Sequence, residues 1–313
     1  MNPKNPTEQS PAGRIAVDWF RRDSSRATVH STFDSVINLK TRSGNLVSLA
    51  DTTVPLSPFT LRVSLPPDGY RPPQGEPVRL RNGQIATESG DWSCRVPHPR
   101  PSGSLRQSSS KINTPEQLSN VVSTLRRHLT RLQPERGLIG IVSSNSSGEV
   151  QFHPETNDGK DYLIKTAELS RNLLKHFTDT NSDALRRDLG GLKGLGPGLT
   201  PSGDDALVGL LAAWRSLHEG VRDGFHQRAG DLVVEQVQQS SSWFSNQWLQ
   251  AASGGLFARP VANLLRSLAT NSSSASLDLA LDRLNKLGSS SGLDVSTGVL
   301  LGLGCVLARE NHN

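Results

Sequence analysis

One stretch, residues 194–205, constrains the fold of this chain more than any other, because glycines, prolines and hydroxyl residues run directly into an apolar segment. The stretch reads Gly-Leu-Gly-Pro-Gly-Leu-Thr-Pro-Ser-Gly-Asp-Asp, and the apolar segment runs from Ala206 to Trp214. Its glycines permit positive φ and close approach of a ligand, and its prolines restrict the turns between them. The pattern predicts a loop that leads into a buried helix, with Thr200 or Ser202 as the helix cap.

A shorter form of this pattern returns near the C-terminus. Residues 291–298 repeat residues 202–209 as Ser-Gly-x-Asp-x-x-x-Gly. The matched positions are Asp205 with Asp294 and Gly209 with Gly298. An aspartate and a glycine four positions apart lie on one helix face, so each helix would carry a carboxylate in its first turn and a notch one turn further. We expect the two helices to pack together and to point their N-termini at one site.

Such a site suits an anion, because a helix N-terminus offers unpaired N–H groups and the positive end of the helix dipole. The residues expected to hold a phosphate or carboxylate are Gly196, Gly198, Thr200, Ser202, Gly203, Ser290, Ser291 and Gly292. The candidate catalytic residues are Asp204, Asp205 and Asp294. These carboxylates could orient a carbamoyl NH2 group, act as a base or hold magnesium, for which Asp204 and Asp205 would be the ligands. The plainer alternative is that they only complement the helix dipoles.

Two familiar nucleotide-binding motifs do not fit the first stretch. Counted from Gly194, a dinucleotide fingerprint would need its third glycine where Leu199 stands. Residues 198–203 have the glycine spacing of a phosphate loop, but Asp204 replaces its lysine and Asp205 replaces its hydroxyl residue. The sequence therefore supports neither a dehydrogenase nor a Walker-type nucleotidase.

Composition narrows the class of protein further. The absence of an apolar run of about 18 residues and of a hydrophobic secretion signal predicts a cytoplasmic chain without a membrane partner. Its two cysteines, Cys94 and Cys305, indicate neither a disulfide framework nor a zinc cluster. The net charge is +5. Because the basic residues are scattered and aromatic residues are few, we expect no nucleic-acid partner, and the positive charge could instead steer a small anionic substrate.

Hydrophobic periodicity predicts an α+β protein with two parts. We expect a flexible arm over residues 1–25, a β-rich barrel or sandwich over 26–101 and a Ser/Arg-rich linker over 102–113. A compact and mostly helical domain should then cover residues 114–313, beginning with a Thr-Pro-Glu-Gln capping box at Thr114. Within that domain, residues 137–143 read as a buried strand that could pair with residues 150–153.

The two glycine-rich stretches resemble the signature motifs of the AllH-type subunit of oxamate carbamoyltransferase, a family formerly known as a domain of unknown function. The first resembling motif is residues 194–205 with Leu207 and Gly209, and the second is residues 288–294 with Gly298. Residues 249–254 between them also look similar. The resemblance is most specific from Gly194 to Leu303 and is looser in the β-rich part, which includes residues 58–63.

The resemblance implies transfer of a carbamoyl group between oxalurate and phosphate, giving oxamate and carbamoyl phosphate, in the anaerobic breakdown of allantoin, a part of purine catabolism. It also implies that the chain acts with an acyl-CoA-synthetase-like subunit and a further subunit. Family members often carry a histidine before the second Ser-Ser-Gly, and this chain has Ser289 there. Two alternatives stay open: a non-catalytic assembly subunit, and a nucleotide- or acyl-phosphate-dependent enzyme with a different substrate range.

Overall fold

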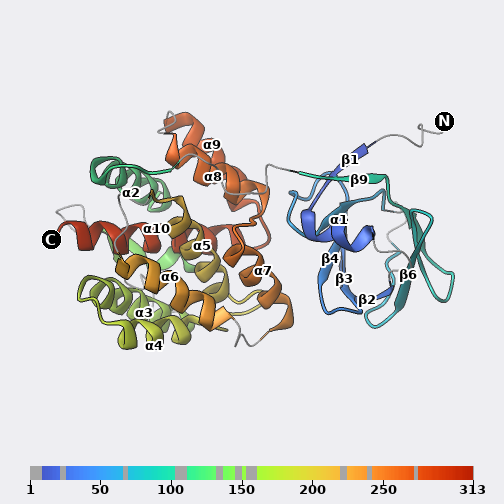
Figure 1. Cartoon of the computed structure of the whole chain (residues 1–313), viewed down its shortest axis with the longest axis horizontal. Helices are drawn as coiled ribbons and strands as arrows, with labels where there is room; N and C mark the ends of the chain where they lie inside the picture. The colour runs from blue at the N-terminus through green and yellow to red at the C-terminus, as the bar shows by residue number, and fades with distance from the viewer. Residues whose placement is uncertain are drawn as a thin grey trace. The chain divides into compact units, whose positions relative to one another are not determined.

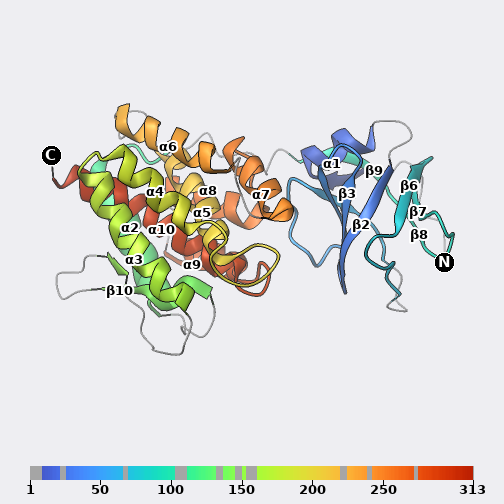
Figure 2. The ribbon, with the colours of Figure 1, turned by 90° about the horizontal axis from the view of Figure 1, so that it is seen from below.

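The computed structural model describes residues 9–21, 26–65, 70–102, 111–131, 137–144, 150–152, 161–218, 224–237, 242–270 and 274–312. The chain divides into two compact units, Met1–Arg106 and Gln107–Asn313 (Figures 1 and 2). The first unit is built mainly of strands and the second mainly of helices, and each has its own cluster of buried apolar side chains. This is the α+β class that the sequence predicts.

A seven-stranded sheet forms the body of the first unit. Its strands are β2 (Arg26–Phe33), β3 (Val36–Thr41), β4 (Leu46–Ala50), β5 (Thr60–Arg62), β6 (Pro77–Arg81), β7 (Gln84–Thr87) and β8 (Ser93–Arg95). Their spatial order is β5-β4-β3-β2-β6-β7-β8, and every neighbouring pair is antiparallel except β4 and β5. Because β5 and β8 stay at opposite edges, these described strands make an open sheet and do not close into a barrel.

The expected flexible arm is ordered over much of its length. Strand β1 (Gln9–Ala12) pairs in parallel with β9 (His98–Pro101), and helix α1 (Arg14–Phe20) follows it directly. The helix buries Ala16, Val17 and Trp19 in the core of the unit. The expectation of a flexible arm was wrong for these residues, because burial of their apolar side chains holds the helix in place. The sequence did not reveal the helix, since seven residues are too few to show helical periodicity. The arm residues 1–8 and 22–25, and linker residues 103–110, lie outside the described residues.

The second unit consists of helices packed around α10 (Figure 1). The elements are α2 (Pro115–Leu129), the 3-10 helix η2 (Gly137–Ile141), β10 (Val142–Ser144), β11 (Val150–Phe152), α3 (Asp161–Thr178), α4 (Ser182–Leu192), α5 (Ser202–Ser216), α6 (Gly224–Val237), α7 (Trp243–Ser253), α8 (Arg259–Ala269), α9 (Ser274–Asn285) and α10 (Ser291–Glu310). Helix α2 begins as predicted, since Thr114 Oγ1 accepts a hydrogen bond from the Gln117 amide at 3.1 Å.

The strand expected at residues 137–143 forms only in part. Residues 137–141 are a 3-10 helix, and the strand β10 that follows pairs antiparallel with β11. Gly137 has a φ of +63°, and the next amide, that of Leu138, donates to the Asp294 carboxylate. A side chain distant in the sequence therefore decides the backbone of this apolar run. His153, expected at the end of the pairing strand, lies outside the described residues.

Helix α10 is the core helix of this unit. Among the described helices it is the one long and apolar enough to span a membrane, with a mean hydropathy of 1.6, but 78% of that segment is buried inside the unit. Its apolar side chains contact the neighbouring helices α2, α3, α5 and α9. Packing of this unit therefore accounts for the apolar composition of α10.

Candidate functional site

Two glycine notches lock α5 against α10. A Cβ atom added to Gly209 would lie 2.1 Å from the carbonyl oxygen of Val295, and one added to Gly298 would lie 2.0 Å from that of Ala206. Further along, the indole Nε1 of Trp214 donates to the carbonyl oxygen of Gly302 at 3.0 Å. Gly298 packs on Ala206 and Gly302, one turn further along α10, packs on Leu210 and Ala213, so the two helices run parallel and begin at the same end of the unit. The pairing expected from the repeated motif is present.

The two helix starts exchange contacts through their aspartates. Asp205 on α5 accepts a hydrogen bond from Thr200 Oγ1 at 3.0 Å and another from the hydroxyl of Ser291 on α10. In turn, the hydroxyl of Ser202 on α5 forms a hydrogen bond with the carboxyl group of Asp294 on α10. Each aspartate therefore faces the first serine of the other motif, and the two Ser-Gly-x-Asp segments form one cluster.

Burial shapes the acid–base behaviour of this cluster. The side chains are closed off from solvent, with exposed fractions of 6% for Asp205 and 0% for Asp294. Burial raises the pKa of Asp205 well above its ordinary value, and the charges of Asp294 and Asp204 add to this, against the lowering effect of hydrogen bonds from Ser291 and Thr200. Burial also raises the pKa of Asp294, but the Leu138 amide opposes it. Burial therefore raises the pKa of both aspartates, and the neighbouring carboxylates add to the effect at Asp205.

Among the described residues, one oxygen of each of two buried carboxylates receives no hydrogen bond of normal geometry. The Oδ1 atom of Asp294 accepts from the Leu138 amide at 2.5 Å, and the Oδ1 atom of Asp204 accepts from the Gly194 amide at 3.0 Å. The Oδ2 atom of each carboxylate receives no hydrogen bond of normal geometry from any residue that the structure describes. A buried acceptor without a donor destabilises the folded chain, so these oxygens are acceptors ready for the N–H groups of a ligand.

The loop before α5 takes a path that requires glycine. Gly194, Gly196 and Gly198 have φ values of +70°, +99° and +101°. Gly203 fills a different role, since its Cβ would lie 1.9 Å from the carbonyl oxygen of Leu192. The equivalent Gly292 would place a Cβ 1.8 Å from the carbonyl oxygen of Leu284. Gly203 and Gly292, expected as ligand-binding residues, are therefore positions of close backbone packing.

The amides at the two helix starts are bonded in part. At the start of α5, the Gly203 amide donates to Leu195 at 2.9 Å and the Asp204 amide donates to Pro201 at 2.9 Å. At the start of α10, the Gly292 amide donates to Leu287 at 3.0 Å. Loop carbonyls thus occupy much of each helix N-terminus. Within the described part of the chain, the amides without a backbone partner in this loop are those of Gly196, Gly198, Leu199 and Thr200.

The remaining expected binding residues lie between the two helix starts. Thr200 Oγ1 is 3.3 Å from Ser291 Oγ, which joins the first loop to the second motif. Ser290 is the N-cap residue of α10, and its hydroxyl lowers the pKa of Asp294. Ser289 is exposed. The structure therefore brings Thr200, Ser202, Ser290 and Ser291 together with the aspartates.

Two residues that the sequence analysis overlooked also belong to this region. Lys193 immediately precedes the loop, and burial lowers its pKa while the charge of Asp204 raises it. Tyr162, at the start of α3, has its pKa raised by burial and by the charge of Asp294. The position of Lys193 beside Gly194 was a signal that could have been used, whereas no sequence pattern links Tyr162 to Asp294.

The geometry does not favour the magnesium alternative. Asp204 holds the Gly194 amide, whereas Asp205 bonds to Thr200 and Ser291, so the two neighbouring carboxylates turn toward different partners. Among the described residues, no group of three or more His, Cys, Asp and Glu side chains is placed to hold a metal ion. We therefore derive no chemical step through a metal at this cluster.

Family comparisons cover both units of the chain. Residues 192–303 match the family described as oxamate carbamoyltransferase subunit AllH, and this range contains both Ser-Gly-x-Asp segments. Residues 11–100 match the AllH family N-terminal domain, and this range of the chain includes α1 and the seven-stranded sheet. No solved structure matches the chain. The two matched ranges together take in most of the sequence.

Proposed function

This chain belongs to the AllH family of oxamate carbamoyltransferase subunits, and from that premise we propose that its α5–α10 cluster binds the carbamoyl-bearing anion of the reaction. The proposed reaction converts oxalurate and phosphate to oxamate and carbamoyl phosphate. The observation that carries the proposal is the meeting of Asp205 and Asp294, both buried, from two distant copies of one motif.

The proposed chemistry needs a group that can give and take a proton. A phosphate oxygen attacks the carbamoyl carbon of oxalurate, and the bond from that carbon to the oxamate nitrogen breaks. The nitrogen gains one proton and hydrogen phosphate loses one, so the reaction exchanges no net proton with solvent. We assign this transfer to Asp205, because burial and the charge of Asp294 raise its pKa and keep a proton available there.

The substrate has an NH2 group that needs an acceptor. Oδ2 of Asp294 is a buried oxygen that receives no hydrogen bond of normal geometry from the described residues, although the Ser202 and Ser290 hydroxyls lie beside this carboxyl group, and its other oxygen is held by the Leu138 amide. An NH2 group bound there would remove the cost of an unsatisfied buried oxygen. In our proposal Asp294 therefore orients the carbamoyl or amide group without taking part in proton transfer.

The negative charge of the substrate needs donors of its own. We place the phosphate or carboxylate at the unbonded amides of residues 196–200, because positive φ at Gly196 and Gly198 opens this backbone to a ligand. The Lys193 ammonium, next to the loop in the sequence, is a further donor. A carboxylate bound here would be stabilised by the positive charge of Lys193 and by hydrogen bonds from the amides of residues 196–200.

Calorimetric titration of the full chain with oxamate tests the proposal, since oxamate carries both a carboxylate and an NH2 group. In an Asp294→Asn variant, the amide NH2 would replace an acceptor with a donor facing the ligand, and we expect affinity to fall by about tenfold or more. Asp183→Asn on the exposed start of α4 is the matched control, and its affinity should equal that of the unchanged chain. Equal oxamate affinity in both variants would remove Asp294 from the site.

An assembly subunit without a ligand site is the second candidate. It is favoured by the contacts in which Asp204 holds the Gly194 amide and Asp294 holds the Leu138 amide, since both are internal tethers. This candidate predicts no oxamate or carbamoyl phosphate binding by the chain alone, but saturable binding to the other subunits. The titration and a parallel subunit-binding assay therefore separate the two functions.

A further inference from the structure

Four arginines lie on one outward face of the sheet in the first unit. The strand register pairs Arg26 with Arg79 across β2 and β6, and it aligns Arg81, Gln84 and Arg95 across β6, β7 and β8. The alternating residues Val78, Leu80, Ile85 and Cys94 are buried on the opposite side. We call the outward residues Arg26, Arg79, Arg81 and Arg95 the arginine face.

The arginine face is costly for the isolated unit. Like charges directly opposite each other on a sheet destabilise it, and Arg26 is directly opposite Arg79. Glu88 forms an ion pair with Arg79 at 2.5 Å, with side chains 39% and 37% exposed. Among the described residues, no acidic side chain forms an ion pair with Arg26, Arg81 or Arg95. Stability of the sheet does not explain this charge pattern.

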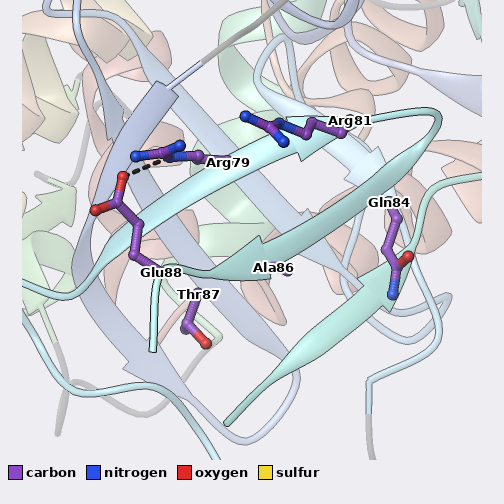
Figure 3. Close-up of a pocket in the computed structure, with 6 residues that line it drawn as sticks. All are labelled: Arg79, Arg81, Gln84, Ala86, Thr87 and Glu88. Atoms are coloured by element: carbon purple, nitrogen blue, oxygen red, sulfur yellow. Dashed lines mark hydrogen bonds and ion pairs between the residues drawn. The ribbon is translucent and has the colours of Figure 1, made fainter. Parts of the chain in front are cut away.

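The face is also hollowed at its centre (Figure 3). An open depression of about 430 Å³ lies over the β6–β7 hairpin and is lined by Arg79, Arg81, Gln84, Ala86, Thr87 and Glu88. Figure 3 shows Arg79 and Arg81 on the same strand, with the Arg79 guanidinium turned to Glu88. A shallow hollow edged by guanidinium groups can receive carboxylates that project from another protein.

We propose that the arginine face docks an acidic surface of another protein subunit of the carbamoyltransferase complex. Arginine is enriched at protein interfaces because its guanidinium pairs with carboxylates through two hydrogen bonds. A second copy of this chain is a poor occupant because its net charge is +5. Nucleic acid is less favoured because the outward neighbours Gln84, Ala86 and Ser93 offer no aromatic ring for stacking.

The test reverses charge on the face and measures binding of the full chain to the co-purified remaining subunits. In an Arg81→Glu and Arg95→Glu double variant we expect the dissociation constant to rise by about tenfold or more, with most of the difference lost at high salt. Arg14→Glu, on the exposed side of α1, is the control and should change affinity by less than about twofold. Both variants should unfold at the temperature of the unchanged chain.

Other outcomes of the same assay would overturn the proposal. Unchanged subunit binding by the double variant would show that the face is not the docking surface. Binding of a mixed-sequence DNA duplex, tighter than subunit binding at equal salt and lost in the double variant, would make the face a nucleic-acid surface. The proposal rests on the family assignment but not on the anion site. Oxamate titration of the double variant keeps the two apart, because that affinity should be unchanged.

Discussion

The segments 182–216 and 274–310 are two helix–loop–helix structures built on one plan, but their loops differ. In the first, the Gly203 amide donates to Leu195 at 2.9 Å, and in the second the Gly292 amide donates to Leu287 at 3.0 Å. Each of these glycines packs on the carbonyl of a leucine near the end of the preceding helix. The shared plan therefore extends beyond the eight residues whose sequence repeats.

The loops and aspartates show where the two copies have diverged. Seven residues separate Leu195 from Gly203, whereas four separate Leu287 from Gly292. The longer loop contains two glycines with positive φ, Gly196 and Gly198, and its aspartate accepts hydrogen bonds from hydroxyl groups. Asp294, in the second copy, holds a backbone amide in addition to its hydroxyl neighbours. The glycines that the copies share thus pack the helices, whereas the aspartates, which the copies also share, differ in their hydrogen-bond partners.

Filling a shared notch should have the largest effect. Gly298→Val would push new carbons into the backbone of α5, because even a Cβ would lie 2.0 Å from the Ala206 carbonyl oxygen. We expect a loss of about 3 kcal/mol or more in the free energy of unfolding, measured by urea titration. Gly230→Ala, on α6 with nothing within 4 Å, is the control and should gain about 0.5–1 kcal/mol. A small loss for Gly298→Val would mean that the helices are not tightly locked.

Removing the carboxylate of the second copy should have the next largest effect. Asp294→Ala leaves the buried Leu138 amide without its acceptor, and we expect a loss of about 2 kcal/mol in the free energy of unfolding. Asp294→Asn keeps an oxygen for that amide and should recover most of the loss. Hydrogen exchange at Leu138 provides a local measurement, with faster exchange expected only in the alanine variant. Equal stability of all three proteins would show that Asp294 does not tether η2.

The first copy should respond in the opposite direction. Asp205→Asn removes a buried carboxyl whose pKa is raised by burial, so we expect stability at pH 7 to increase by about 1 kcal/mol. Because the folded chain binds this proton more tightly than the unfolded chain, the stability of the unchanged protein falls as pH rises above the ordinary value of 3.8. The gain of the variant should therefore disappear below about pH 3.8. Urea titrations from acidic to neutral pH measure this difference, and a gain that does not depend on pH would contradict it.

The smallest difference concerns the two loops themselves. Gly198 has a φ of +101° and Gly288 a φ of +65°, so alanine at either position should cost about 1 kcal/mol of stability through backbone strain. Only Gly198→Ala should also weaken oxamate binding, by about threefold to tenfold, because the proposed anion site lies in the loop of Gly198 and not in that of Gly288. Equal oxamate affinities in these two variants would place the anion elsewhere.

Short-range patterns in the sequence predicted the parts of this structure that depend on helical spacing. The Ser-Gly-x-Asp-x-x-x-Gly repeat was sufficient to pair α5 with α10, because spacing alone places its aspartate and glycine on one helix face. The 3-10 turn at Gly137 was not predictable, because it depends on a contact with Asp294, which is 156 positions from Leu138. Helix α1 was missed because seven residues carry too little periodicity.

The hydrogen bonds at the helix starts show a second limit of sequence reasoning. The sequence predicts free amides at the first turn of α5, but the loop folds back so that Leu195 and Pro201 accept from Gly203 and Asp204. Which amides stay unbonded depends on the path of the loop, which glycine permits without fixing. Of the residues expected to hold the anion, Gly196, Gly198 and Thr200 keep amides without a backbone partner among the described residues, whereas the amides of Gly203 and Gly292 are bonded.

The carbamoyl-transfer rate of the assembled complex carrying Asp205→Asn tests the central claim most directly, with Asp183→Asn as the matched control. Asparagine keeps the size of the side chain but cannot give and take the proton, and we expect the rate to fall by about 100-fold or more while the complex stays assembled. The control should keep the full rate. An Asp205→Asn complex with a rate within about twofold of the control would contradict the account, because the paired aspartates would then only pack the two helices.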